Sequence, residues 1–337
     1  MMPARMFDYA AMTAPVEQPA SSRDLVSAQD FSPEETQALF ELTNIIKHRP
    51  ADFRGALAGK QLVLFFEKAS LRTRLTFEAG MASLGGTSLF MDQTRSRLGE
   101  REPVGDIARN VERWVDGVVL RTYEHKTITD MAENTRIPVI NALSDVEHPC
   151  QAFADFFTLW EKFGDLRQVH LAYVGDGNNV AHSLMLVAAA LGTSISVATP
   201  QGYEPDHGIT AAAKQIGRIT GAIIEITNDP SAAVTGANAI YTDVWTSMGQ
   251  EAEAAERARI FAPYQVNQAL FALAAPNAVF MHCLPAHRGE EVAADVIDSP
   301  RSVVFDQAEN RMHVQKAILL MLLGSGMGRV PSRNNYA

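Results

Sequence analysis

The chain has 337 residues, which is long for one hydrophobic core and sufficient for two domains. Hydrophobic residues make up 47% of it, so a large core is expected and extensive disorder is not. The net charge of −10, without any basic run, argues against a nucleic-acid partner, because such binding depends on contacts to phosphate. No apolar run reaches membrane-spanning length, so we expect no membrane partner.

The two cysteines, Cys150 and Cys283, do not form a Cys-x-x-Cys pair, which argues against a zinc ribbon or a disulfide framework. Free thiols are typical of a reducing compartment, so we expect a cytoplasmic protein. Residues 1–24 lack both the apolar core of a signal peptide and the Arg-rich composition of a transit peptide. They are expected to form a flexible polar extension.

Strands and helices are expected to alternate in the first half of the chain. Ser32, Pro33 and Glu35 form a capping-box pattern, which predicts a helix start near Ser32 and a helix that runs to about Lys47. After it, the pattern predicts strands at 61–66, 87–91, 117–120 and 138–140, and helices at 75–84 and 106–115. This spacing is typical of βαβ units and predicts a parallel sheet.

A long amphipathic helix at 149–163 is expected to separate this half from a second βαβ series. The predicted strands of the second series are 169–174, 194–198, 223–227, 239–242 and 279–281, with helices at 180–191 and 310–323. The predicted fold is therefore α/β, with two similar domains, each a mainly parallel sheet flanked by helices, joined by two interdomain helices. Because ligands of such sheets bind beyond the carboxyl ends of strands, the cleft between the domains is the expected site.

Residues 70–74, Ser-Leu-Arg-Thr-Arg, lie between an expected strand and an expected helix. Unpaired N–H groups at a helix N-terminus favour an anion, the two hydroxyls add donors, and Arg72 can form two parallel bonds to phosphate. The alternative is a solvated helix start, with a capping serine and an Arg74–Glu78 pair. A cationic turn in an acidic protein favours a small anion over a polymer.

Arg121 follows the strand at 117–120 and so lies at the ligand edge of the sheet. A single arginine at such a rim more often pairs with an acid. His148 and Gln151 lie at the start of the helix at 149–163, where they can donate to a carbonyl oxygen and interact with an amide. The alternative for a lone histidine is a structural role.

Residues 175–179, Gly-Asp-Gly-Asn-Asn, follow a strand and open a helix. They lack the third glycine and the downstream acid of a dinucleotide site, so they favour a turn that presents asparagine amides to a small ligand over NAD binding. Asp243 also follows a strand and can hold an ammonium group, and residues 245–250 have the flexibility of a lid. The alternative for Asp243 is the N-cap of an ordinary loop.

Cys283 follows the last expected strand and is interpreted as a thiol that contacts the ligand. A nucleophilic Cys–His pair and a zinc site with His282 and His287 are the alternatives. Covalent catalysis is disfavoured because no further protease-like or amidase-like pattern occurs in the chain. Cys150 is expected to be a small buried hydrophobe.

In combination, these motifs closely resemble those of the ornithine carbamoyltransferases, from about Leu25 to the last helix. Residues 70–74 are similar to the family's carbamoyl phosphate sequence Ser-Thr-Arg-Thr-Arg, with Leu71 in place of threonine. Because the family uses the backbone N–H at this position, the exchange should be tolerated. Residues 148–151, His-Pro-Cys-Gln, resemble the second carbamoyl phosphate motif.

Asp243 with residues 247–249 resembles the family's ornithine-binding segment, and residues 282–285 resemble its active-site cysteine motif. Aspartate-using relatives lack this pair of motifs, and relatives that use putrescine or N-acylornithine differ in the Ser-Met-Gly region. The resemblance therefore implies carbamoyl transfer to the δ-amine of ornithine, in arginine metabolism. A carbamoyltransferase for putrescine or N-acylornithine is the alternative within this class. A dehydrogenase module and a non-catalytic carbamoyl phosphate-binding protein are alternatives outside it.

The resemblance also implies the site and its organisation, with neither a cofactor nor a metal. The carbamoyl phosphate side is expected to comprise Ser70, Leu71, Arg72, Thr73, Arg121, His148, Gln151, Cys283, Leu284 and Arg311. The ornithine side is expected to comprise Asn179, Asp243, Ser247 and Met248. The residues expected to be catalytic are Arg72, Arg121, His148 and Cys283. The expected domains are 25–148, completed by a C-terminal helix at 312–337, for carbamoyl phosphate, and 149–311 for ornithine.

The family is at least trimeric, with sites at subunit boundaries, so the resemblance implies a homotrimer or a multiple of trimers. Related enzymes reach a neighbour's phosphate site with a loop that corresponds to residues 92–100. Arg95, Arg97 and Arg101 make this loop unusually cationic here. We predict that Arg97 contacts carbamoyl phosphate in the adjacent subunit, and the alternative is a solvated loop.

Overall fold

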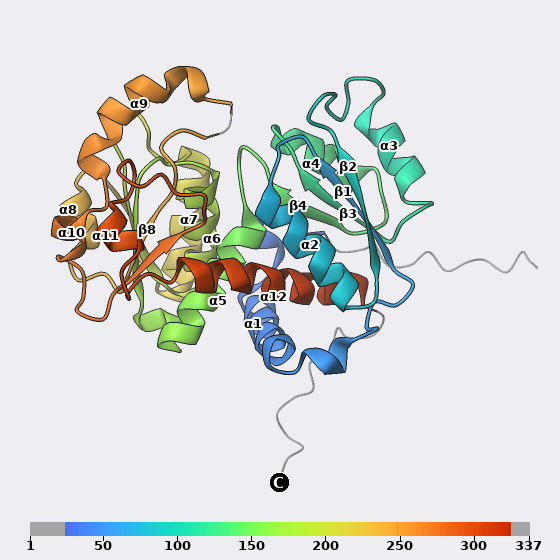
Figure 1. Cartoon of the computed structure of the whole chain (residues 1–337), viewed down its shortest axis with the longest axis horizontal. Coiled ribbons are helices and arrows are strands. Elements are labelled where there is room, and N and C mark those ends of the chain that lie inside the picture. Colours follow the sequence, from blue (N-terminus) through green and yellow to red (C-terminus); the bar gives the residue numbers. More distant parts are fainter. Residues whose placement is uncertain (1–23, 248, 325–337) are drawn as a thin grey trace, which may run out of the picture.

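The computed structural model describes residues 24–247 and 249–324. Most of the predicted N-terminal extension and the end of the predicted C-terminal helix lie outside this range, as does Met248. The two sheets occupy separate lobes, at the right and left of Figure 1, and long helices run between them. No helix in the described ranges has both the length and the apolarity needed to cross a membrane.

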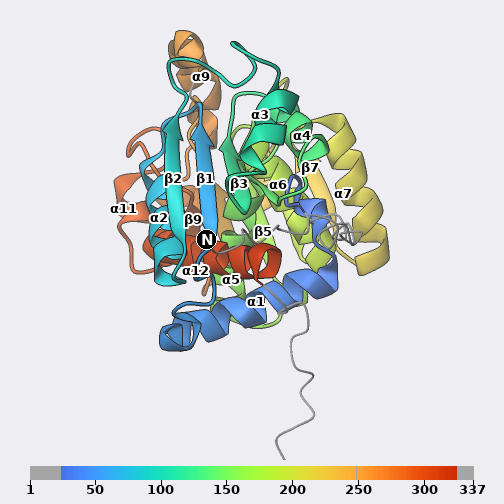
Figure 2. The same ribbon diagram turned by 90° about the vertical axis from the view of Figure 1, so that its right-hand side faces the viewer.

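The first lobe contains a parallel sheet with the strand order β2-β1-β3-β4 (Figure 2). Its strands are β1 (Gln61–Phe66), β2 (Thr87–Asp92), β3 (Gly117–Arg121) and β4 (Val139–Leu143). Its helices are α2 (Leu71–Ser83), α3 (Val104–Val111) and α4 (His125–Glu133).

Alternate residues of β1 enter two different cores, as the period of a strand requires. Leu62 and Leu64 belong to the large core that also contains Phe77 of α2, whereas Val63 and Phe65 pack into a smaller core with residues of α3 and α4. Both faces of the strand are therefore covered, which explains its continuous apolar run.

The second lobe contains a parallel sheet with the order β7-β6-β5-β8-β9. Its strands are β5 (His170–Val174), β6 (Ser194–Ala198), β7 (Ile224–Thr227), β8 (Ala239–Thr242) and β9 (Val279–His282). Its helices are α6 (Asn179–Leu191), α7 (His207–Thr220), α8 (Pro230–Val234), α9 (Ala254–Phe261), α10 (Gln268–Phe271) and α11 (Ala294–Ile297). In both lobes the strands are parallel, so their carboxyl ends meet at one edge.

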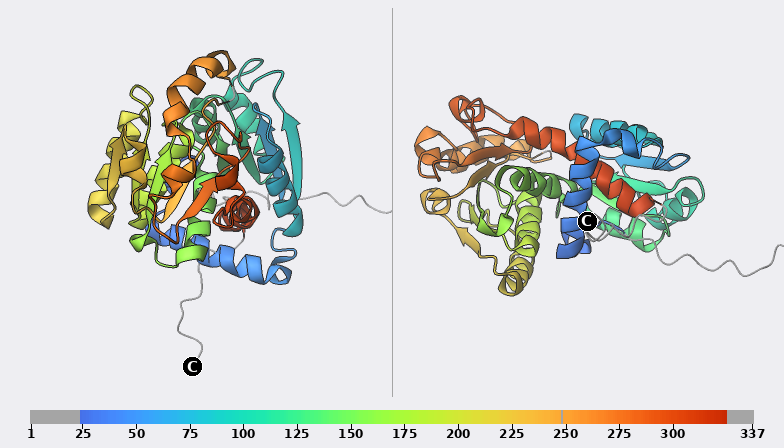
Figure 3. Two further views of the ribbon diagram at one scale, coloured as in Figure 1. Left: turned by 60° about the vertical axis from the view of Figure 1, so that its left-hand side comes forward. Right: turned by 90° about the horizontal axis from the view of Figure 1, so that it is seen from below.

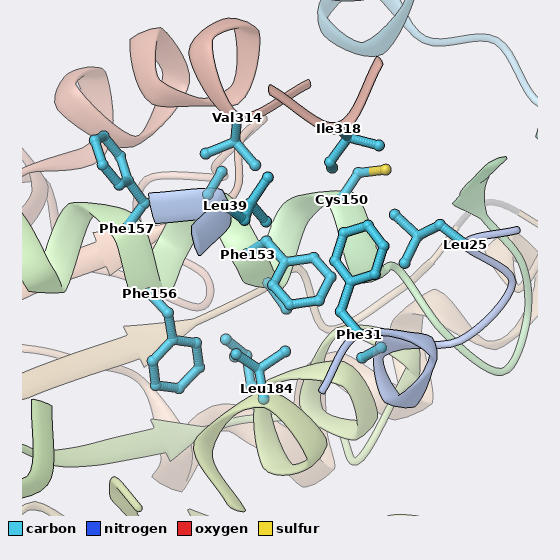
Figure 4. Close-up of a cluster of buried hydrophobic side chains, with 14 of the residues drawn as sticks. Leu25, Phe31, Leu39, Cys150, Phe153, Phe156, Phe157, Leu184, Val314 and Ile318 are labelled. Carbon is cyan, nitrogen blue, oxygen red and sulfur yellow. The ribbon is translucent and has the colours of Figure 1, made fainter. Parts of the chain in front are cut away.

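Three helices hold the lobes together: α1 (Pro33–His48), α5 (Pro149–Phe163) and α12 (Val304–Leu323) (Figure 3). Figure 4 shows Phe153 of α5 between Leu184 of α6 and Ile318 of α12, with Phe156 of α5 beside Leu184. Burying each such side chain contributes about 1.5–3 kcal/mol, so this one apolar core ties both lobes to α5. Cys150 is fully buried within it, which confirms its expected place as a small hydrophobe.

The predicted fold class is confirmed, but several helix limits were wrong. Helix α2 begins at Leu71 rather than Leu75, because the Ser70 hydroxyl accepts the Thr73 N–H at 3.3 Å and caps a polar first turn. Helix α12 begins at Val304 rather than Asn310, since its first two turns carry too few apolar residues to show a period. Helix α4 and the helices from α7 to α11 were not predicted.

Candidate active site

A cleft of about 870 Å³ lies between the two lobes, at the edge where the strands of both sheets end. Thirteen of the predicted site residues line it: Ser70, Leu71, Arg72, Thr73, Arg121, His148, Gln151, Asn179, Asp243, Ser247, Cys283, Leu284 and Arg311. Met248 lies outside the described residues. Arg97 is not among the lining residues; its guanidinium lies 4.0 Å from the centre of the Tyr123 ring, which is part of the wall.

The start of α2 forms one end of the cleft. Ser70 caps the helix and also donates its hydroxyl to the Thr73 hydroxyl at 3.0 Å. Arg311 of α12, which is distant from Thr73 in the sequence, donates to the same Thr73 oxygen at 2.6 Å. The first N–H groups of a helix have no partner within it, so the N–H groups near Leu71 are available to an anion. The alternative Arg74–Glu78 pair is also present, at 3.2 Å, and is compatible with this site.

Two buried arginines, Arg121 and Arg311, give the cleft its charge. They are 7% and 4% exposed, and within the described ranges the Nε of each has no hydrogen-bond partner. Burial, with the positive charge of Arg311 as a second cause, lowers the pKa of Arg121 to about 9. Burial also lowers the pKa of Arg311. Buried cations without a paired acid are costly, so the arrangement is suited to an anionic ligand.

His148 and Gln151 lie beside these arginines at the start of α5. The ring of His148 is buried, and burial together with the charges of Arg311 and Arg121 places its pKa well below the usual value. The imidazole is therefore neutral at pH 7, and its Nδ1 has no partner among the described residues. Gln151 donates its Nε2 to Asp155 at 2.8 Å, and its Oε1 has no partner in the part of the chain that the structure describes.

Asp243, just after β8, forms the opposite wall with Asn178 and Cys283. Asn178 Nδ2 donates to Asp243 Oδ2 at 2.9 Å, and the Cys283 thiol donates to Asp243 Oδ1 at 3.0 Å. Burial, followed by the negative charge of Asp243, raises the pKa of Cys283 well above its usual value. The sulfur is consequently an uncharged thiol at neutral pH, which disfavours the nucleophilic Cys–His alternative.

Neither the N-cap alternative for Asp243 nor a zinc site that joins His282 and Cys283 to His287 is supported by the geometry. No helix begins at Asp243, since the next helical turn starts at Glu251. The two ring nitrogens of His282 are engaged, Nδ1 with the Leu284 N–H at 2.8 Å and Nε2 with Glu291 at 3.2 Å. His287 instead lies with Glu290 and Glu291, apart from Cys283.

Three functional candidates were missed: Lys68, Asp155 and Arg257. Lys68 lines the cleft, and burial, with the charge of Arg121 as second cause, lowers its pKa. Its position in the cationic run before α2 was a usable signal. Asp155 is an acid within the apolar stretch of α5 between Ala152 and Phe157, also a usable signal.

Arg257 gave no such signal, because it lies in the charged segment of α9. Its Nε donates to the Trp245 carbonyl at 2.5 Å, and its guanidinium pairs with Asp176. These contacts anchor the start of the loop that contains Ser247.

Comparison with known proteins agrees with this geometry. The family model of the aspartate/ornithine carbamoyltransferase carbamoyl-P binding domain matches residues 23–161, and that of the Asp/Orn binding domain matches residues 167–322. The chain belongs to the aspartate/ornithine carbamoyltransferase family.

Its similar relatives are ornithine carbamoyltransferases. The enzyme of Pyrococcus abyssi is 51% identical, covering 90% of this chain and 96% of that protein. The anabolic ornithine carbamoyltransferase of Pyrococcus furiosus is 50% identical, covering 90% and 97%. The solved structure of ornithine carbamoyltransferase from Pyrococcus furiosus matches with a TM-score of 0.88 at 50% identity, covering 90% of this chain and 98% of that one.

Proposed function

We propose that the chain is an ornithine carbamoyltransferase, which transfers the carbamoyl group of carbamoyl phosphate to the δ-amine of L-ornithine and yields L-citrulline and phosphate. The observation that carries this proposal is one cleft with two chemically different walls. Buried arginines whose Nε atoms have no partner among the described residues line one part, and the Asp243–Cys283 pair lines another. The names of the similar relatives support the same reaction.

On the first wall, the start of α2 holds the phosphate. Ser70, Thr73 and the N–H groups near Leu71 donate to its oxygens, while Arg72 and Arg121 supply charge. The carbamoyl group extends toward His148, Gln151, Arg311 and the residues Cys283 and Leu284. Arg121 and His148 stabilise the charge that develops on the carbonyl oxygen, and one such donor contributes about 3 kcal/mol to catalysis.

On the second wall, Asp243 binds the α-ammonium group of ornithine, and Asn179 and Ser247 complete the subsite. The δ-amine must arrive uncharged, although a lysine-like ammonium has a pKa of about 10.4. Closure of the loop at 245–250 removes water and favours the neutral amine, beside the uncharged thiol of Cys283.

The chemical step is an acyl transfer without a covalent enzyme intermediate. The δ-nitrogen forms a bond to the carbamoyl carbon, and the bond from that carbon to the phosphate oxygen breaks. The electron pair of the broken bond leaves with the phosphate, which also accepts the proton that the amine loses. A protein general base is therefore unnecessary, and holding both substrates in line supplies much of the acceleration.

The reaction is tested by a transfer assay with carbamoyl phosphate fixed and the amine varied among ornithine, N-acetylornithine, putrescine and aspartate. Ureido product and released phosphate are measured together. Exclusive turnover of ornithine is the expected result. Turnover of another amine would leave the carbamoyl phosphate assignment of the first wall intact. It would refute the assignment of the Asp243 wall to ornithine. Binding of carbamoyl phosphate without any turnover would place the chain among non-catalytic binding proteins.

We propose a homotrimer as the active assembly. Leu89 and Met91 are 46% and 44% exposed on the same face of the edge strand β2, an arrangement that a second copy of the chain would cover. Light scattering should then give about three times the 36.8 kDa of one chain. Both cysteines are free, which supports a cytoplasmic enzyme, and the anabolic relative supports a role in arginine synthesis.

Arg97 is proposed to reach the phosphate of the adjacent subunit, since it is exposed in the single chain and lies outside its own cleft lining. Arg97→Ala should raise the KM for carbamoyl phosphate by about 3- to 10-fold, the effect of losing one charge-assisted contact. The measurement is steady-state kinetics at saturating ornithine. Arg95→Ala, in the same loop, is the control. An unchanged KM in Arg97→Ala would refute the proposed contact.

A further inference from the structure

Asp155 is an acid in the middle of the apolar helix α5, and it is fully buried. Three donors converge on its carboxyl group. Gln151 Nε2 and Gln307 Nε2 donate to Oδ1 at 2.8 and 2.9 Å, and the Tyr241 hydroxyl donates to Oδ2 at 3.0 Å. A buried polar group with this many partners has a fixed orientation, because each lost bond leaves a donor unpaired.

Gln151 lines the cleft, and its bond to Asp155 decides which end of the amide is left to meet a ligand. With Nε2 held by Asp155, Oε1 is the end that remains, and it is buried without a partner among the described residues. Rotating the amide by 180° would place Oε1 against Asp155 Oδ1, so two acceptors would face each other. Asp155 therefore selects an acceptor, rather than a donor, for the cleft.

The same carboxyl is tied to the strands that carry the second wall. Gln307 uses its own Oε1 to accept the N–H of His282 at 3.0 Å, one residue before Cys283. Tyr241 belongs to β8 and lies two residues before Asp243. Asp155 thus fixes Gln151 relative to the ends of β8 and β9.

We propose that Asp155 is a positioning residue that presents Gln151 Oε1 to the carbamoyl NH2 group, so that the site prefers acyl phosphates with an N–H on the acyl carbon. This inference rests on the proposed function. It adds a discrimination between carbamoyl and acetyl groups, which have nearly the same size and differ at this position in having NH2 or CH3. An unpaired buried acceptor facing CH3 loses a hydrogen bond, so the preference should be about tenfold.

The test compares two stable phosphonates by isothermal titration calorimetry. Phosphonoacetamide carries the NH2 group, and acetonylphosphonate carries CH3 in its place. The parent should bind the amide about tenfold more tightly. In Asp155→Leu, where no acceptor holds Gln151, the preference should fall below about twofold. Inorganic phosphate, which needs only the start of α2 and the arginines, should bind both proteins equally.

Asp155→Asn is the matched conservative variant. The asparagine Oδ1 can still accept from both glutamines. Its Nδ2 donates to the Tyr241 oxygen, so only the bond with Tyr241 changes direction. The tenfold preference should therefore survive in Asp155→Asn, although the charge is gone. Loss of the preference in Asp155→Asn would show that charge, rather than amide orientation, is responsible, and would overturn the inference.

Asp155→Ala replaces Asp155→Leu in the test if the leucine variant does not fold. Alanine is smaller and places no apolar side-chain atoms in contact with the three donors. The preference should fall there as well. A folded Leu or Ala variant that keeps the parent's preference would also overturn the inference. Absence of carbamoyl transfer to any amine by the parent would instead refute the proposed function, so the two failures are distinguishable.

Discussion

Arg121→Met should reduce kcat/KM for carbamoyl phosphate by about 10³-fold or more, because one side chain serves both the phosphate and the developing oxyanion. The same substitution should increase the free energy of unfolding of the ligand-free protein by about 1–3 kcal/mol. The reason is the burial of the Arg121 charge, which lowers its pKa to about 9 and finds no acid to pair with among the described residues. Steady-state kinetics and urea unfolding measure the two effects.

The control is Arg109→Met, which removes an exposed guanidinium from α3. It should leave activity and stability nearly unchanged, since exposed pairs contribute about 0–1 kcal/mol. Inorganic phosphate should raise the melting temperature of the parent and of Arg109→Met. The increase for Arg121→Met should be much smaller. A ligand-free Arg121→Met variant that is less stable than the parent would contradict this prediction. It would show that the Arg121 charge does not destabilise the protein in the absence of an anion.

Asp243→Asn should reduce kcat/KM for ornithine by about 10²- to 10³-fold, because it removes the charge that binds the α-ammonium group. The asparagine has nearly the same shape, and its oxygen can still accept from the Cys283 thiol or from Asn178. The KM for carbamoyl phosphate should therefore remain within about threefold of the parent value. Initial rates with each substrate varied in turn separate the two effects.

Asp298→Asn is the corresponding control, since Asp298 is exposed and pairs with Arg288 in the same lobe. It should leave both kinetic constants unchanged. An equal loss for ornithine and carbamoyl phosphate in Asp243→Asn would indicate a distorted cleft and contradict the assigned role. An unchanged constant for ornithine would remove Asp243 from the substrate subsite.

Most of the parallel strands could be predicted because their buried apolar runs are bounded by glycine and polar residues, although β2 is largely exposed. The site could be predicted as far as its residues follow strand ends, as Arg121, Asp243 and Cys283 do. The first and last residues of the helices were harder to predict from the sequence. The start of α2 depends on a hydroxyl that caps a polar turn, and the residues that α7 buries fully, Ala213 and Gly217, are small.

Long-range contacts of the site were beyond prediction from sequence alone. Arg311 reaches Thr73 across 238 positions of the chain, and Gln307 reaches Asp155 across 152. Arg257 is nearly completely buried although its neighbours in sequence are charged. No local period or spacing encodes such contacts, because they depend on how the lobes and α12 pack together.

The place of α12 has a consequence for how the chain folds during its synthesis. This helix packs against α1, α2 and α5, and its Leu323 lies close to Gly117 of β3, so the N-terminal lobe is completed by residues that are made long after its own sheet. When the whole first sheet has been translated, the large core of this lobe still lacks the residues that α12 contributes to it. The native packing of the lobe made first must therefore wait until residues 304–323 have left the exit tunnel.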